Sequence, residues 1–230
     1  MRNDIICFIP ARKKSSLKNK NMIKIDNKPL IYYTLNSAKN SKYIKDTYVS
    51  SDSLEIINYS KKFNVKVLKR PKKLAASSSK GHEVISHFVK KNISLIKNKS
   101  LLILQPTSPL RKTSHIDKAI NLHYQNRHKP IISVKKIDNK FLKGLIFKKK
   151  YLIPLENGRF VQENRQSLPK IFLPNGAIFL FSIKDFKKNN KIPYKKSLPM
   201  FMSEKESIDL DTKKDLIKIK RILTKNEKKF

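Results

Sequence analysis

Glycine is scarce in this sequence, with four glycines among 230 residues. Neither the G-x-G-x-x-G fingerprint of dinucleotide-binding folds nor the G-x-x-x-x-G-K loop of many nucleotide hydrolases can be written with them. The G-x-S-x-G turn of serine hydrolases and the H-E-x-x-H motif of zinc peptidases are also absent. The sequence therefore excludes these motif-defined classes.

Cysteine and long apolar runs are also lacking. The one cysteine, Cys7, cannot form an intramolecular disulfide, and its place inside the apolar run Ile5–Ile9 indicates a buried structural thiol. No run approaches the ~18 apolar residues of a membrane span, and the first run is too short for a signal peptide. The five histidines lack a spacing that would place two zinc ligands on one helix face. We expect a cytoplasmic protein without a membrane segment.

Acidic residues are few, so the chain is very basic. It has 53 Lys and Arg against 17 Asp and Glu, a formal charge of +36. Such a balance suggests a polyanionic partner, with nucleic acid the first candidate. The lysines are spread along the whole chain, however, and aromatic residues for base stacking are not interleaved with them. An anionic small substrate is compatible with the same charge, and no specific nucleic acid is expected.

Short apolar runs alternate with amphipathic stretches, a pattern typical of an α/β fold with a mostly parallel sheet flanked by helices. We expect one domain over residues 1–230, with a small arm at about 135–170, where the alternation breaks, that packs on a second subunit. Strands are predicted near Ile5–Ile9, Thr47–Ser50, Val65–Leu68, Leu101–Gln105, Ile131–Val134 and Ala177–Phe181. Helices are predicted near Pro29–Lys39, Leu54–Phe63, Glu83–Lys91, Ile116–Tyr124 and Thr212–Leu223.

A basic loop follows the first predicted strand. It reads Ala11-Arg12-Lys13-Lys14-Ser15-Ser16-Leu17-Lys18-Asn19-Lys20-Asn21. Ligands of open α/β sheets bind at the carboxyl ends of strands, where cationic and hydroxyl side chains would surround phosphates. A solvated, lysine-rich surface loop is the alternative for this segment taken alone.

Two carboxylates, Asp209 and Asp211, lie two residues apart in the segment Ser207–Thr212. In an extended backbone both point to the same side, as Mg²⁺ requires when it also binds substrate phosphates. The alternative is that one aspartate only caps the following helix.

The loop Leu104-Gln105-Pro106-Thr107-Ser108-Pro109-Leu110-Arg111 is made rigid by two prolines. Gln105 could contact a base or a sugar, and Arg111 could pair with an anion. Alone, the segment could equally be a helix-entry turn.

Together these segments resemble the acylneuraminate cytidylyltransferases, also called CMP-sialic acid synthetases, over essentially the whole chain. The Lys20-Asn21 ending of the first loop resembles the sialic-type branch more than the relatives that act on 3-deoxy-manno-octulosonate. Further matching segments are Val49–Asp52, Leu68–Pro71, Arg165–Pro169 and Pro174–Phe179.

The resemblance implies a nucleotide-diphospho-sugar-transferase-like fold, a homodimer, and a reaction of CTP with an acidic nine-carbon sugar that yields a CMP-sugar and pyrophosphate. N-acetylneuraminate is the first candidate sugar, with legionaminate and pseudaminate as alternatives. The implied roles are catalysis by Arg12, Lys20 and Asp211; nucleotide binding by Arg12, Ser15, Lys20, Asn21, Arg70 and Gln105; sugar binding by Gln105, Lys143, Arg165 and Asn175; and Mg²⁺ binding by Asp209 and Asp211.

The sequence departs from the family pattern at several positions. The first loop has no glycine, although relatives commonly have two there, so its phosphate cradle should differ in shape. Lys80-Gly81 replaces the usual serines, and Leu173 precedes Pro174 where relatives often have arginine. An inactive or repurposed relative, or a basic nucleic-acid-binding protein on the same scaffold, remains a second hypothesis.

Overall fold

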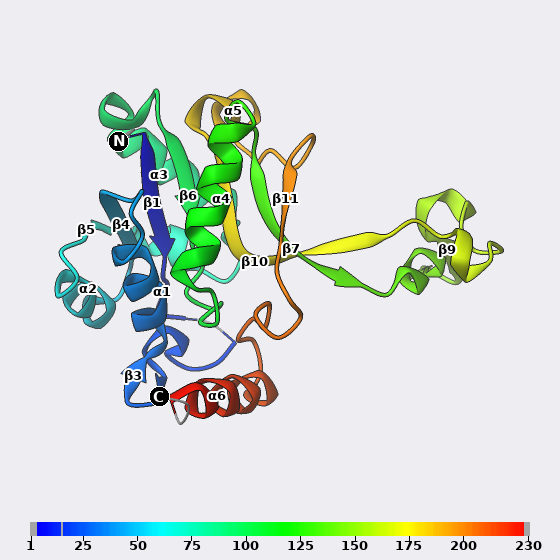
Figure 1. Cartoon of the computed structure of the whole chain (residues 1–230), viewed down its shortest axis with the longest axis horizontal. Coiled ribbons are helices and arrows are strands. Elements are labelled where there is room, and N and C mark those ends of the chain that lie inside the picture. The colour runs from blue at the N-terminus through cyan, green and yellow to red at the C-terminus, as the bar shows by residue number, and fades with distance from the viewer. Residues whose placement is uncertain (1–3, 15, 228–230) are drawn as a thin grey trace.

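A mixed sheet is the centre of the computed structural model, which describes residues 4–14 and 16–227 (Figure 1). Its seven strands lie in the order β11-β7-β10-β6-β1-β4-β5. Neighbouring strands are parallel, except that β10 is antiparallel to both β6 and β7. The predicted α/β fold with a mostly parallel sheet is thus confirmed. The strands are β1 (Ile5–Pro10), β4 (Asp46–Ser51), β5 (Lys66–Lys69), β6 (Ser100–Ile103), β7 (Ile131–Ile137), β10 (Ile171–Ser182) and β11 (Leu198–Phe201).

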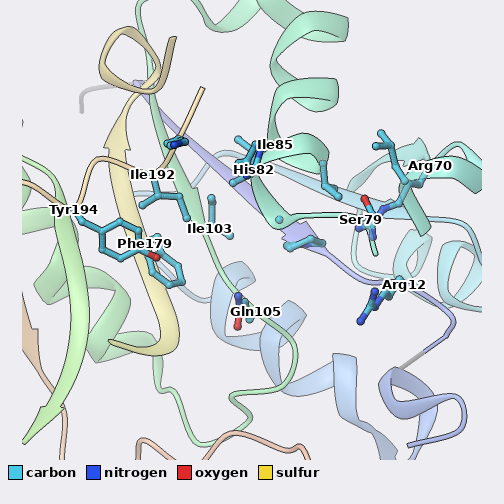
Figure 2. A pocket seen from close by; sticks show the side chains of 15 residues that line it. Arg12, Arg70, Ser79, His82, Ile85, Ile103, Gln105, Phe179, Ile192 and Tyr194 are labelled. Atoms are coloured by element: carbon cyan, nitrogen blue, oxygen red, sulfur yellow. The ribbon is translucent and has the colours of Figure 1, made fainter. Parts of the chain in front are cut away.

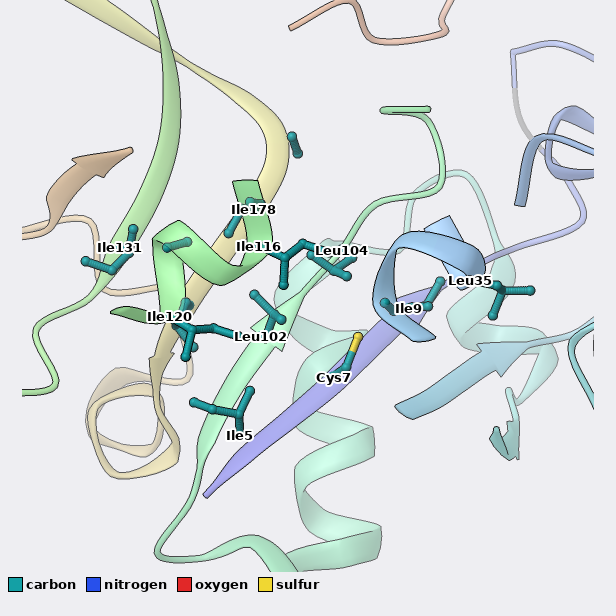
Figure 3. Packing of buried hydrophobic residues seen from close by; sticks show 14 of the residues in the cluster. Ile5, Cys7, Ile9, Leu35, Leu102, Leu104, Ile116, Ile120, Ile131 and Ile178 are labelled. Carbon is teal, nitrogen blue, oxygen red and sulfur yellow. The ribbon is translucent and has the colours of Figure 1, made fainter. Parts of the chain in front are cut away.

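Helices cover both faces of the sheet. The side chains of β1 are apolar on both faces, because successive residues of a strand alternate between the faces, and each face needs a cover. Ile5, Cys7 and Ile9 belong to the cluster that packs under α1 and α4 (Figure 3), whereas Ile6 and Phe8 pack with α3 and α5. Cys7 is fully buried, and this burial raises its pKa to about 12, as expected of a structural thiol. The helices are α1 (Leu30–Lys39), α2 (Leu54–Lys61), α3 (Gly81–Ile96), α4 (Thr113–Gln125), α5 (Ile183–Asn189) and α6 (Lys213–Glu227).

Several elements were not predicted from the sequence. These are α5, β11 and the small hairpin of β2 (Lys24–Ile25) and β3 (Lys28–Pro29). Short 3-10 turns are η1 (Lys20–Met22), η2 (Lys72–Ala75), η3 (Asn139–Lys143), η4 (Leu155–Gly158) and η5 (Arg165–Ser167). Within the described residues, no helix has both the length and the apolar character needed to cross a membrane.

The predicted arm extends away from the sheet (Figure 1). It continues from β7, passes through the hairpin of β8 (Leu145–Lys148) and β9 (Tyr151–Pro154), and returns along β10. Apolar side chains of the hairpin are exposed, with Ile146 52%, Phe147 72% and Leu152 62% accessible. The arm therefore has little core of its own.

Candidate active site

The loop after β1 forms without glycine. Asn19 adopts the left-handed conformation, with φ of 51°, which asparagine tolerates better than most residues. It leads into η1, where Lys20 and Asn21 are buried. Asn21 Nδ2 donates a hydrogen bond of 2.8 Å to the carbonyl oxygen of Arg12, which fastens the end of the loop to its start. Ser15, predicted to contact a nucleotide, lies outside the described residues.

A cleft of about 640 Å³ opens beside this loop (Figure 2). Arg12, Arg70 and Gln105 line it, and they follow the carboxyl ends of β1, β5 and β6. Ligands of open α/β sheets bind at this edge. The structure thus brings together three residues that the sequence placed around a nucleotide.

Two arginines give one side of the cleft its charge. Arg12 Nη1 donates to the carbonyl oxygen of Ala76 at 3.1 Å, and Arg70 donates to the carbonyl oxygen of Ser50 at 2.9 Å. The pKa of Arg70 is lowered to about 10, mainly by burial; the charge of Asp52 opposes this lowering, and the charge of Arg12 adds to it. Because this pKa is well above neutral, Arg70 stays charged at neutral pH. The pair of guanidinium groups is suited to phosphate oxygens.

The other side of the cleft is apolar and aromatic (Figure 2). The rings of Phe179, from β10, and Tyr194, from the segment after α5, have centroids 6.4 Å apart, and Ile103 and Ile192 lie beside them. His82, in the first turn of α3, also lines the cleft. Sequence reasoning did not single out Phe179, Tyr194 or His82. Phe179 belongs to a quoted family segment, but the lysine-rich surroundings of Tyr194 carry no such signal.

A second cavity, of about 610 Å³, adjoins the cleft. Phe179 and Tyr194 line both. Gly176, which lines the second cavity, lies against Gln105 of the cleft, since a Cβ placed on Gly176 would fall 2.7 Å from Gln105 Oε1. The two hollows are therefore halves of one site, with Gln105 at their border.

Asp209 contributes a half-buried carboxylate to the second cavity, and its Oδ1 is buried. Its Oδ1 has no hydrogen-bond partner within the described residues. Burial raises the pKa of Asp209. A hydrogen bond with the Thr107 side chain lowers this pKa, and the negative charge of Asp211 raises it. The backbone on its carboxyl side is fixed, because Leu210 N donates to the carbonyl oxygen of Thr107 at 2.8 Å. A buried carboxylate oxygen without a partner is costly unless a cation covers it.

Asp211 lies in the same segment between β11 and α6 and also lines the second cavity. Lys20 Nζ approaches its Oδ1 to 2.9 Å. No group of three or more His, Cys, Asp or Glu side chains arranged for a metal occurs in the described parts of the chain. Two carboxylates nevertheless fit Mg²⁺, which usually keeps several waters and binds one or two protein carboxylates together with substrate phosphates. The donor set is therefore suited to a metal that arrives with a nucleotide.

Arg111 requires a correction. It was interpreted as a partner for an anion, but its side chain is buried in the protein. Its guanidinium donates to the carbonyl oxygens of Gln105 at 3.1 Å and Ala177 at 3.0 Å, and to Thr34 Oγ1 at 2.7 Å. Arg111 thus joins α1, the loop after β6 and β10, and supports the site without facing it.

Comparison with known families decides the assignment. A family model described as Cytidylyltransferase matches residues 6–226, a range that includes both halves of the site. The chain belongs to the cytidylyltransferase family. The resemblance found in the sequence is confirmed.

Named cytidylyltransferases are among its relatives. An N-acylneuraminate cytidylyltransferase of Escherichia coli O18:K1:H7 is 29% identical over 221 residues, which cover 94% of this chain and 51% of that protein. The chain spans about half the length of several curated relatives of this kind. Two others match over nearly their full length at 30% identity. They are the post-translational flagellin modification protein B of Campylobacter coli, with 98% and 97% coverage, and a CMP-N,N'-diacetyllegionaminic acid synthase of Legionella pneumophila, with 97% of each chain.

Solved structures support the cytidylyltransferase fold. A structure of CMP:2-keto-3-deoxy-manno-octonic acid synthetase complexed with CTP matches with a TM-score of 0.73, covering 97% of this chain and 99% of that one at 12% identity. A 4-diphosphocytidyl-2C-methyl-D-erythritol synthase matches with a TM-score of 0.68 at 13% identity. The nucleotide-diphospho-sugar-transferase-like fold expected from the sequence is confirmed.

Three residues predicted to bind sugar lie in two different places in the structure. Asn175 lines the second cavity, but its side chain is 6% exposed, and its carboxamide bonds Ser133 and Ser207. Lys143 and Arg165 lie on the arm, in η3 and η5, and Arg165 Nη2 contacts Asp138 Oδ2 at 3.3 Å. Their predicted role in sugar binding stays a prediction.

Proposed function

We propose that this chain transfers CMP from CTP to the anomeric hydroxyl of an acidic nine-carbon keto sugar, and that pyrophosphate is released. The observation that carries the proposal is the joined site, in which a cleft with two arginines adjoins a pair of carboxylates across the contact between Gln105 and Gly176. The cleft supplies cations for the phosphates of CTP, and the second cavity supplies carboxylates for a metal and space for a sugar. Membership of the cytidylyltransferase family supports the same reaction class.

CTP would occupy the cleft with its phosphates toward the loop after β1. Arg12 and Arg70 offer guanidinium groups to phosphate oxygens, and Ser79 and His82, at the start of α3, line the same cleft. The apolar side of the cleft, with Phe179 and Tyr194, suits the flat face of a base or sugar ring. This arrangement would align CTP for attack at its α-phosphorus.

Asp209 and Asp211 would hold Mg²⁺ together with phosphate oxygens, since Asp209 Oδ1 is buried and without a partner in the described chain. When bound, the metal supplies positive charge that offsets the negative charge developing on the phosphates. In the transfer, the anomeric oxygen forms a bond to the α-phosphorus, the bond from that phosphorus to the bridging oxygen breaks, and the hydroxyl proton is released. The protein's share is alignment and charge stabilisation.

The sugar acid would lie in the second cavity, across Gln105 from the nucleotide. Lys135 lines this cavity and supplies a cation for the sugar carboxylate. N-acetylneuraminate is our first candidate because N-acylneuraminate cytidylyltransferases are among the relatives. Relatives named for legionaminic and pseudaminic acid make these the competing sugars.

The arm would pair with a second copy of the chain. Eight apolar residues at and next to the β8–β9 hairpin are at least 37% exposed: Phe141, Leu145, Ile146, Phe147, Tyr151, Leu152, Ile153 and Leu155. An isolated two-stranded hairpin is marginally stable in water, so a partner surface is needed to cover these side chains.

One assay tests the proposal. The protein is incubated with CTP, Mg²⁺ and each member of a panel containing N-acetylneuraminate, N,N'-diacetyllegionaminate, pseudaminate and 3-deoxy-manno-octulosonate, and pyrophosphate is measured. We expect release with one nonulosonic acid and little with the eight-carbon acid. Absence of release with every acid, together with absence of CTP binding by calorimetry, would refute the proposal.

A further inference from the structure

Strand β10 contains an irregularity at the border between the two halves of the site. Its register with β7 shifts between Pro174 and Phe179. Gly176, inside this interval, has φ of +77°, a conformation that residues with a side chain rarely adopt. Irregularities of this kind often redirect side chains near active sites. At this irregularity the Asn175 side chain bonds Ser133 and Ser207, whereas Gly176 lies against Gln105.

Asn175 connects the strand β7 to the segment that carries the two carboxylates. Its Oδ1 accepts a hydrogen bond of 2.5 Å from Ser133 Oγ, and its Nδ2 donates one of 2.8 Å to Ser207 Oγ. The exposed fractions are 0% for Ser133, 6% for Asn175 and 3% for Ser207. Ser207 precedes Asp209 by two residues, so this buried chain of hydrogen bonds holds the start of the carboxylate segment against the sheet.

Gly176 acts on Gln105 instead. A Cβ at position 176 would lie 2.7 Å from Gln105 Oε1, closer than real Cβ contacts allow. The missing side chain therefore leaves the space in which the carboxamide of Gln105 rests against the backbone of β10. Any larger residue at this position would have to displace that carboxamide from the border of the two cavities.

We infer that Asn175 and Gly176 are positioning residues of the transfer site, with Asn175 fixing the metal-binding carboxylates and Gly176 fixing Gln105. The inference rests on the proposed function and assigns one residue to each half of the site. Neighbouring positions in the chain should consequently give different defects. Loss of the Asn175 bonds should weaken metal binding, whereas a side chain at 176 should impair the use of CTP and sugar.

The first experiment compares Asn175→Ala with Asn175→Leu, which fills a similar volume but can neither accept a hydrogen bond from Ser133 nor donate one to Ser207. In the metal-free protein, hydrogen exchange of amides in residues 203–211 should be faster in both variants than in the parent. In the presence of CTP, the Mn²⁺ dissociation constant measured by calorimetry should rise about 10-fold, as is typical when a group supporting metal ligands is lost. The KM for CTP at saturating metal should change less than about 2-fold.

The second experiment uses Gly176→Ala, with Gly158→Ala as the matched control. Gly158 also has positive φ, at +83°, but lies on the arm away from Gln105, so it reports the backbone strain alone. Gly176→Ala should lower kcat/KM roughly 10- to 100-fold, the range expected from a displacement of about 1 Å in a reacting site. The metal requirement should not change, and Gly158→Ala should stay within about 2-fold of the parent.

A double variant shows whether Gly176 acts through Gln105. If it does, Gly176→Ala combined with Gln105→Ala should be no worse than Gln105→Ala alone, because the carboxamide that clashes is gone. If Gly176→Ala folds poorly because of this clash, the double variant should fold better. Thermal unfolding of each variant measures how well it folds. Additive losses, or exchange at residues 203–211 that is unchanged in Asn175→Ala, would overturn the inference. A parent protein that neither binds CTP nor releases pyrophosphate would refute the proposed function instead. The exchange measurement would still test whether Asn175 holds residues 203–211 in place.

Discussion

Lys20 Nζ lies 2.9 Å from Asp211 Oδ1, which joins the loop after the first strand to the segment before the last helix. The lysine side chain is 7% exposed and the aspartate side chain 66%. The ammonium group therefore has a carboxylate partner at its buried position, whereas the carboxylate keeps a face open to the second cavity. In the proposed site, Asp211 would bind the metal on its open side, and Lys20 would lie near the phosphates.

Removal of the metal carboxylates should abolish turnover. Asp209→Asn and Asp211→Asn should each fold and lose at least roughly two orders of magnitude in the rate of pyrophosphate release, because a bound metal supplies several kcal/mol of charge stabilisation. EDTA should abolish turnover of the parent. Asp46→Asn is the control, since Asp46 pairs with Lys66 on the surface and should keep near-normal rates. Near-normal turnover of both site variants would contradict the metal assignment.

The cations of the first loop should differ in importance. Arg12 lines the cleft and Lys20 pairs with Asp211, whereas the Lys13 side chain is exposed and only its backbone N–H bonds Asp52. Arg12→Ala and Lys20→Ala should each weaken CTP affinity or lower the rate of pyrophosphate release roughly 10- to 150-fold. This range corresponds to the loss of one charge-assisted hydrogen bond. Lys13→Ala should have little effect. Equal losses at all three positions, measured by CTP titration and steady-state rates, would mean that the loop supplies only diffuse charge.

The arm should control the oligomeric state. Phe147→Glu places a charge on the exposed face of β8 and should convert a dimer to a monomer at micromolar concentration in analytical ultracentrifugation. Leu95→Glu is a matched control, because Leu95 is similarly exposed, at 63% against 72%, but lies on α3 outside the arm. The control should remain a dimer. A parent that sediments as a monomer would refute the pairing of the arm.

The segment between β11 and α6 should be stabilised by an acid-sensitive contact. Glu206 accepts hydrogen bonds from Ser203 Oγ at 2.7 Å and Lys112 Nζ at 3.0 Å, and the Ser203 bond is the main reason that its pKa falls to about 2. A lowered carboxyl pKa gives stability that is complete above the unfolded-state value of about 4.3 and is lost as pH falls toward 2. Glu206→Gln should therefore cost about 1–2 kcal/mol in urea unfolding at pH 7. The difference from the parent should shrink below about pH 4, and a constant difference would refute the assignment.

Salt should separate the enzyme from a nucleic-acid-binding protein. The charge of +36 should produce DNA or RNA binding at low salt that has no sequence preference and weakens by orders of magnitude between about 50 and 200 mM salt. Binding of CTP with Mg²⁺ should weaken less, because a partly enclosed site is screened less than an open surface. Titrations of both ligands at the two salt concentrations check this. Tight, sequence-selective RNA binding at the higher salt without CTP binding would support the competing function.

Local patterns predicted the elements that carry most of the core. The run at β1 is apolar at every position because both of its faces are covered, and the helices α1, α2 and α4 begin or end within a few residues of their predicted bounds. The pattern failed for α5, which buries only Ile183 and Phe186, and for β11, which contains Pro199. Proline is tolerated there because β11 is at the edge of the sheet.

The candidate site could be predicted in part. Arg12, Arg70 and Gln105 each follow the carboxyl end of a strand. Because ligands of open α/β sheets bind at this edge, the sequence alone predicts that the three residues lie together. The role of Arg111 could not be predicted, because the carbonyl oxygen of Ala177 and the hydroxyl of Thr34 come to it from distant parts of the chain. The contact between Gly176 and Gln105 is likewise a product of tertiary packing and has no local signature.

The sheet is complete once β11 ends at Phe201, whereas the two carboxylates of the proposed metal site follow it, at positions 209 and 211. During synthesis, the nascent chain can thus form every strand of the sheet and the arginine side of the cleft before Asp209 leaves the ribosome. Until then Lys20 has no carboxylate from Asp211 beside it, and the cluster of Ile25 and Leu30 lacks Leu210 and Ile219. As the chain emerges, the sheet can therefore form before the proposed metal site is complete.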